Sequence, residues 1–166
     1  MKIVKKILIG LVMLFAAAQF IRPTRMNPSV DEQQTIQAGG RIPSEVSAIL
    51  ERSCYDCHSN STAWPWYSNV TPVSWWLVDH VNSGRTELCF SEWATYKSRR
   101  MVRKLQEMCD QVEQNEMPLA SYLLLHPAAR LTDDDKRLLC DWAHQERERI
   151  IATMPDSVRQ RMSPPR

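Results

Sequence analysis

Hydrophobic residues recur at helical spacing in four stretches of the chain. Val46, Ile49 and Leu50 fall on one face of a first helix, which ends at about Cys57. Residues typical of helix ends mark the other boundaries. The expected helices begin at Ser44, at Thr71 with Pro72 (ending at Gly84), at Ser91 (running to about Asn115) and at Thr132.

The third of these stretches has two distinct sides. Its apolar side is expected to be buried, whereas the basic side is expected to be a solvated face. The apolar side holds Met101, Leu105, Met108, Cys109 and Val112, and the basic side holds Lys97, Arg99, Arg100, Arg103 and Lys104.

The scarcity of glycine supports an all-α fold. The chain has only four glycines, which disfavours a sheet with tight turns and favours helices joined by proline-containing loops. A net charge of +2 gives no indication of nucleic-acid binding.

The N-terminus carries the pattern of an export or anchoring segment. Lys2, Lys5 and Lys6 precede an uncharged apolar run from Ile7 to Ile21. An uncleaved membrane anchor with its lysines in the cytoplasm is expected, and cleavage after Ala18 is the alternative. The expected organisation is an anchor or signal segment over residues 1–21, a tether over 22–42, a helical domain over 43–153 and a disordered basic tail over 154–166.

The motif Cys54-Tyr55-Asp56-Cys57-His58 is the strongest chemical signal in the chain. Two cysteines three residues apart, followed directly by histidine, are the signature for covalent attachment of one haem. Each thiol bonds to the porphyrin, and the histidine provides the proximal iron ligand. A thioredoxin-like redox pair and half of a zinc site are the alternative interpretations.

Met117 is the preferred candidate for the sixth iron ligand. It precedes Pro118 in a loop far enough from His58 to reach the opposite side of a haem. The alternative for Met117 is simple packing between helices. The rival ligands are Met101, Met108, His80, His126 and His144.

Aromatic side chains concentrate just after the cysteine motif. They are expected to exclude water from the haem, and Arg85 could pair with a haem propionate or remain a surface residue. The expected aromatic lining consists of Trp64, Trp66, Tyr67 and Trp75.

Three further cysteines lie outside the motif. Cys109 and Cys140 fall on helices expected to pack together, so either a disulfide or a pair of buried apolar thiols is expected. Cys89 would then be buried or available for an intermolecular bond.

The arrangement resembles class I cytochromes c, with a helix that ends at Cys54–His58, a distal Met117 and a final helix containing Trp142. More narrowly, it is similar to a family of haem-binding domains over about residues 40–146. The resemblance rests on the motif that runs on to Asn60, on Trp64-Pro65-Trp66-Tyr67, Pro72-x-Ser74-Trp75, Gly84-Arg85, Phe90-Ser91-x-x-Trp93, Glu116-Met117-Pro118 and His126-Pro127. It implies a membrane-tethered periplasmic cytochrome with a single haem.

The expected function is transfer of single electrons to or from a periplasmic or inner-membrane redox partner, without catalysis. The alternative is a five-coordinate haem sensor or peroxidase-like enzyme, in which His80 or His126 acts as a distal acid or base. A thiol–disulfide protein without haem is a third possibility, but the chain shows no strands of the kind a thioredoxin fold needs.

Overall fold

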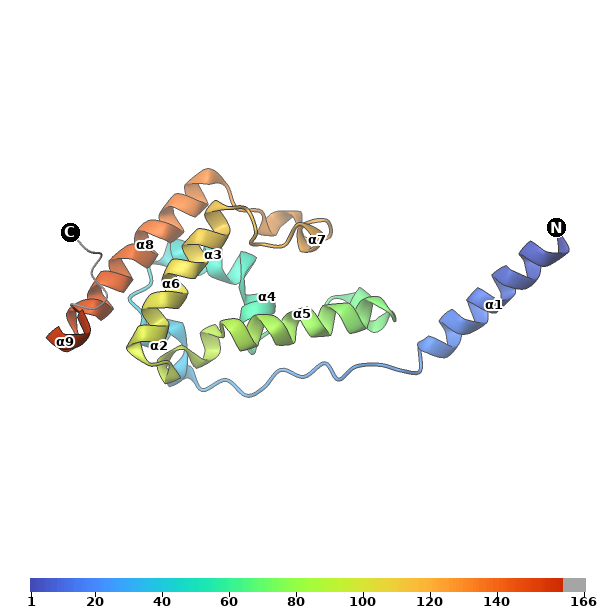
Figure 1. The fold of residues 1–166 in the computed structure, drawn as a ribbon, viewed down its shortest axis with the longest axis horizontal. Coiled ribbons are helices and arrows are strands. Elements are labelled where there is room, and N and C mark those ends of the chain that lie inside the picture. Colours follow the sequence, from blue (N-terminus) through green and yellow to red (C-terminus); the bar gives the residue numbers. More distant parts are fainter. Residues whose placement is uncertain (160–166) are drawn as a thin grey trace.

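The computed structural model describes residues 1–159, and the regular secondary structure in this part of the chain is helical throughout (Figure 1). The expectation of an all-α fold is confirmed. The helices and helical turns are α1 (Lys2–Ala18), η1 (Glu32–Gln34), α2 (Ile36–Gly39), α3 (Ser44–Ser53), α4 (Tyr55–His58), η2 (Trp66–Asn69), α5 (Val73–Glu87), η3 (Phe90–Thr95), α6 (Ser98–Glu113), α7 (Ala120–Leu123), η4 (Pro127–Ala129), α8 (Asp133–Ala152) and α9 (Asp156–Arg159).

The core of the domain lies where α6 packs against α8, and α3 closes it from a third side. Val46, Leu50, Leu105 and Leu139 are almost completely excluded from solvent there. Burial of each such side chain contributes about 1.5–3 kcal/mol. Of these three helices α3 contacts α4, which packs most extensively against α5.

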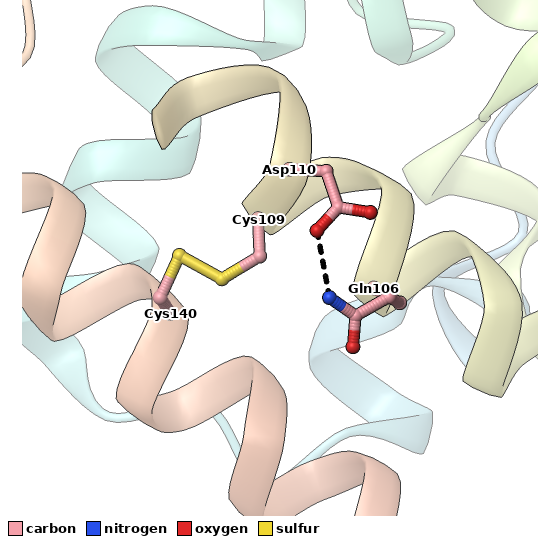
Figure 2. The surroundings of a disulfide bond; sticks show 4 residues. All are labelled: Gln106, Cys109, Asp110 and Cys140. Carbon is pink, nitrogen blue, oxygen red and sulfur yellow. Dashed lines mark hydrogen bonds between the residues drawn. A yellow bond between two sulfur atoms is a disulfide. The ribbon is translucent and has the colours of Figure 1, made fainter. Parts of the chain in front are cut away.

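A disulfide between Cys109 and Cys140 joins α6 to α8 (Figure 2). The structure thus selects the disulfide from the two possibilities that the sequence left open. Cys89 is a free, buried thiol whose Sγ lies 3.6 Å from Oδ1 of Asn60.

Helix α8 begins where the sequence predicts. The Thr132 hydroxyl accepts a hydrogen bond from the Asp135 amide, and the Asp135 carboxylate accepts one from the Thr132 amide. This reciprocal pair is a capping box, which satisfies amides that the helix itself leaves without partners.

The other residues expected to open helices do not cap them with their side chains. Helix α3 begins at Ser44, as expected, but Pro43 occupies its cap position. The Thr71 hydroxyl lies 3.2 Å from that of Ser74 and caps no helix amide. Ser91 belongs to η3, and α6 begins only at Ser98.

The segment after α8 departs from the expected disordered tail. Met154 is buried against the core, and α9 follows it directly. The remainder of the expected tail, residues 160–166, lies outside the described residues.

Helix α1 projects away from the body of the domain, and its side chains are exposed (Figure 1). None of the helices over residues 1–159 combines the length and the apolar character needed to cross a membrane.

The segment after α1 is not the free tether that composition suggests. It runs alongside α5 (Figure 1), and hydrogen bonds fix it at several points. The Arg25 guanidinium donates to the Ser68 hydroxyl at 2.9 Å, and the Asn27 amide donates to the Thr62 carbonyl at 2.9 Å. Polar side chains therefore attach this segment to the domain.

Candidate functional site

The cysteine motif lies at the junction of α3 and α4. The Cys54 amide still donates to the Leu50 carbonyl at 2.9 Å, but the Cys54 backbone (φ −126°) leaves the helical conformation. A new turn then forms, in which the His58 amide donates to the Cys54 carbonyl at 2.9 Å. The motif therefore occupies one short turn, with Cys54 and His58 on the same side.

The His58 ring is held by two backbone carbonyls. Its Nδ1 lies 3.0 Å from the carbonyl oxygens of both Gly84 and Leu88. Carbonyl oxygens only accept hydrogen bonds, so Nδ1 carries the proton and Nε2 keeps its lone pair. Burial lowers the pKa of His58, which favours the neutral ring.

Gly84 lies inside α5, not at its end as the sequence suggests. A Cβ at this position would stand 2.7 Å from the Cys57 carbonyl oxygen, so only glycine allows α5 to approach α4 this closely. The approach also brings the Gly84 carbonyl within reach of His58.

A cavity of about 290 Å³ opens beside His58. It lies near the lower end of the range for small-molecule sites. The residues that line it are Ser53, Cys54, His58, Glu87, Leu88, Phe90, Lys104, Glu107, Met108, Gln111, Val112, Met117, Pro118 and Leu131.

Met117, the preferred candidate for the sixth iron ligand, lines the same cavity as Cys54 and His58. After α6 the chain turns at Asn115, whose φ is +59°. The amides of Glu116 and Met117 then donate to the Gln111 carbonyl at 2.9 and 3.2 Å. These bonds fix the loop that presents the thioether.

Among the rival ligands, only Met108 lines this cavity. Nδ1 of His80 lies 2.8 Å from the carbonyl oxygen of Trp76, and Nε2 of His126 lies 2.7 Å from the hydroxyl of Tyr67. Met101 packs at the edge of the core, and His144 is exposed.

Lys104 lies against the cavity and is not on a solvated face as expected. The residue is only 7% exposed, and its Nζ lies 3.0 Å from Glu87 and 2.8 Å from Glu107. The spacing from Lys104 to Met108 and Gln111 places all three on one side of α6. That spacing is a sequence signal that could have identified them.

Phe90 provides the aromatic surface next to His58. Its ring stacks on Tyr55 with a centroid distance of 5.4 Å and meets His58 edge-on at 6.2 Å. Phe90 was not among the aromatic residues predicted to line the site, because the prediction rested on the denser aromatic cluster just after the motif.

A second, smaller cavity borders the same motif. Cys57 lines it together with Tyr67, whereas Cys54 lines the larger cavity. Asp56, Tyr122 and His126 complete much of its wall. The turn α4 thus contributes to both cavities.

The three tryptophans expected around the haem lie elsewhere. Trp64 donates from Nε1 to Asn27 at 3.1 Å, and Trp75 donates to the Ile21 carbonyl at 2.8 Å. Trp66 is 76% exposed. The indole N–H groups of Trp64 and Trp75 bind the segment that follows α1, so the positions of these two side chains depend on that segment.

The Arg85 guanidinium also binds the segment that follows α1. It donates to the carbonyls of Ser59 and Met26, to the Asn27 side chain and to the Thr62 hydroxyl, at 2.8–2.9 Å. These partners differ from the propionate that the sequence suggested.

Both motif cysteines are free in the structure. Burial raises the pKa of the Cys54 thiol to about 12 and that of the Cys57 thiol to about 11. A thioredoxin-type pair needs a lowered thiol pKa. The described residues also contain no strand. Neither the pKa values of the two thiols nor the fold therefore supports the thiol–disulfide alternative.

Comparison with known proteins identifies the family. A family model described as "Haem-binding domain" matches residues 13–145. The chain belongs to this family of haem-binding domains. Neither the curated proteins nor the solved structures that were compared give a match.

The geometry fits the group that the family implies. Cys54, His58 and Met117 share one largely apolar cavity, and Nε2 of His58 is left with its lone pair. This donor set suits a haem iron.

Proposed function

We propose that the protein is a c-type cytochrome that carries single electrons. One haem would be attached to Cys54 and Cys57, with His58 and Met117 as the iron ligands. The observation that carries this proposal is the placement of His58. Both of its carbonyl partners engage Nδ1, while the ring lines the cavity that also contains Met117.

The protein side chains would tune and shield the redox centre. A bound haem supplies an iron that exchanges one electron between its ferrous and ferric states. The two carbonyls fix the His58 ring orientation and make Nε2 a stronger donor. The Met117 thioether favours the reduced iron and raises the potential relative to a second histidine. Phe90 and Leu88 exclude water from the cavity.

The N-terminal sequence and the disulfide support a periplasmic location at the inner membrane, which is consistent with this function. The lysines of α1 precede an apolar run typical of exported or anchored chains. The Cys109–Cys140 disulfide suits an oxidising compartment. We therefore infer that a periplasmic or inner-membrane redox partner exchanges electrons with this domain.

The decisive experiment is optical spectroscopy on the full-length chain matured with haem in a bacterial periplasm. We expect a covalent haem that resists acid extraction, a low-spin reduced spectrum and no change with carbon monoxide. Met117→Ala should give a high-spin iron that binds carbon monoxide. Met108→Ala, the matched control in the same cavity, should keep the low-spin spectrum.

Other outcomes assign other functions. A wild-type reduced spectrum that is high-spin and shifts with carbon monoxide would exclude methionine ligation and indicate the open site of a sensor or peroxidase. In that case His80 and His126 would be poor distal acids or bases, because neither lines the main cavity. Absence of covalent haem would overturn the proposal.

A further inference from the structure

Exposed apolar side chains gather at one end of the domain. Beyond the first 26 residues, seven large hydrophobic side chains of the described chain are exposed, and only Leu138 lies apart from the others. The remaining six are Trp66, Val73, Trp75, Trp76, Leu124 and Leu125, here called the apolar end. Leu124 is the most exposed of them, at 81%.

Contacts between neighbouring residues bring these side chains together. The hydroxyl of Tyr67 and Nε2 of His126 lie 2.7 Å apart. This contact joins the residue after Trp66 to the residue after Leu125. The turn η2 also packs against α5. The remaining members of the apolar end, Val73, Trp75 and Trp76, lie near the N-terminus of α5.

The two chain segments that form the apolar end carry no charge. Residues 59–78 contain no Asp, Glu, Lys or Arg, and neither do residues 117–129. Charged side chains make up 24% of the whole sequence, so these two runs are unusual for the chain. A surface without charged groups can enter a medium of low dielectric constant without the free-energy cost of removing water from an ion.

Helix α1 ends directly at this surface. The Gln19 side chain donates to the Thr71 carbonyl at 2.9 Å and accepts from the Thr71 amide at 3.0 Å. The Trp75 indole donates to the Ile21 carbonyl at 2.8 Å. Phe20 and Ile21, which are 91% and 67% exposed, therefore continue the apolar end toward α1.

We propose that the apolar end lies against a lipid bilayer surface, together with α1. This proposal rests on the membrane location in the proposed function. Tryptophan is enriched at the boundary between lipid and water, where its ring is buried and its N–H finds a polar partner. The apolar end has three tryptophans near the C-terminus of the exposed apolar helix α1, which is the arrangement expected at that boundary. No residue of the apolar end lines the haem cavity, which would stay open to a soluble partner.

Lipid photo-crosslinking on the full-length protein, produced in a bacterial periplasm with haem supplied, tests the proposal. The protein is inserted into vesicles of phosphatidylethanolamine and phosphatidylglycerol that contain a lipid with a photoreactive acyl chain. We expect lipid adducts on α1 and, in addition, on peptides that cover residues 62–78 and 119–127. Adducts confined to α1 would overturn the proposal, because the apolar end would then face water or a second copy of the chain.

A matched pair of variants sharpens the test. The double change Leu124→Glu with Leu125→Glu places carboxylates on the apolar end and should lower adducts on residues 62–78 several-fold, with those on α1 retained. Leu138→Glu changes an exposed leucine of α8 that lies outside the apolar end and should leave all adducts unchanged. Equal adducts in all three proteins would also overturn the proposal.

The haem spectrum of the same samples separates this proposal from the proposed function. An unchanged low-spin spectrum with adducts confined to α1 rejects only the contact of the apolar end with lipid. Adducts on the apolar end with no haem signal would reject the cytochrome and keep the membrane contact.

Discussion

The hydroxyl of Tyr122 donates a hydrogen bond of 2.6 Å to Oδ2 of Asp56. Asp56 lies between the two cysteines of the motif, and Tyr122 lies five residues after Met117. Oδ1 of Asp56 accepts a further hydrogen bond from the amide of Ala63. The segment that presents Met117 is therefore fastened to the turn that presents His58.

Tyr122→Phe should loosen this connection. Burial and the Asp56 carboxylate raise the pKa of Tyr122, so the phenol stays a donor at neutral pH. Loss of its hydrogen bond to a carboxylate should lower the free energy of unfolding by about 1–2 kcal/mol. The haem-loaded variant should also bind carbon monoxide where the wild type does not, which optical titration would detect.

Tyr96→Phe is the control for that variant. It also removes one buried hydroxyl partner, because the Tyr96 oxygen accepts from the Cys89 amide at 2.8 Å. A similar loss of stability is expected without carbon monoxide binding. Carbon monoxide binding by both variants would show that the effect is general loosening and not the Tyr122–Asp56 contact.

Gly84→Ala should separate α5 from α4. The new Cβ would stand 2.7 Å from the Cys57 carbonyl oxygen and 3.2 Å from its carbon, and backbone atoms cannot rotate away. Overpacking of this kind costs about 1–3 kcal/mol. Thermal unfolding should show the loss, and the yield of covalent haem should fall because the His58 ring loses its fixed partners.

Gly39→Ala provides the matched comparison for the change at Gly84. Its Cβ would meet nothing closer than 3.5 Å, which is ordinary contact. Wild-type haem yield is expected in this variant. A haem yield that falls equally in both variants would contradict the role assigned to Gly84.

Removal of the disulfide should destabilise the domain without changing its helices. Cys109 and Cys140 are 31 residues apart, and a loop of this size corresponds to about 3–4 kcal/mol of chain entropy. Replacing both with alanine should lower the midpoint of chemical unfolding, with the far-ultraviolet circular dichroism of the folded state unchanged. An unchanged midpoint would show that the bond contributes nothing to stability.

Thiol counting gives an independent check on the cysteines. The chain has five cysteines, and the disulfide uses two, which leaves Cys54, Cys57 and Cys89 free. Alkylation under denaturing conditions should therefore modify three thiols before haem attachment and only Cys89 afterwards. Mass spectrometry would read both states.

Asp135 should make stability depend on acid pH. The Thr132 amide, which donates a hydrogen bond to this carboxylate, and the nearby Arg52 guanidinium hold the pKa of Asp135 below its usual value. A depressed folded pKa stabilises the protein above the unfolded pKa of about 3.9, and the contribution is lost as pH falls through the folded value.

Asp135→Asn should accordingly cost about 1 kcal/mol at neutral pH. The difference from wild type should shrink toward zero as the solution is acidified below the folded pKa of Asp135. Asp134→Asn, at the exposed neighbouring position, should show little effect at any pH. Urea unfolding at several pH values measures all three proteins.

Local interactions explain what the sequence predicted correctly. The capping box at Thr132 and Asp135 involves residues three apart, so a short stretch of sequence contains the whole interaction. The helix before the motif follows from apolar residues at helical spacing, which do not depend on distant parts of the chain. The cysteine motif and Met117 were selected as site candidates because their chemistry belongs to particular residue types, and the structure places Cys54, His58 and Met117 at one cavity.

Long-range contacts explain what the sequence predicted wrongly. The sequence around Gly84 suggests that a helix ends there, but in the structure Gly84 allows α5 to approach Cys57. Lys104 looks like part of a solvated face, but Glu87 of another helix binds it at the cavity. Each contact joins two different helices, so the spacing within one helix does not identify the partner.

The sequence by itself determined the all-helical fold, the cysteine motif and a candidate methionine that lines the same cavity as His58, because each depends on residue type and short spacing. Only the tertiary structure decided where the aromatic and basic side chains went. Trp64, Trp75 and Arg85 all bind the segment after α1, since its carbonyl and amide groups need hydrogen-bond partners that only the folded domain brings near. Phe90 therefore provides the aromatic surface beside His58.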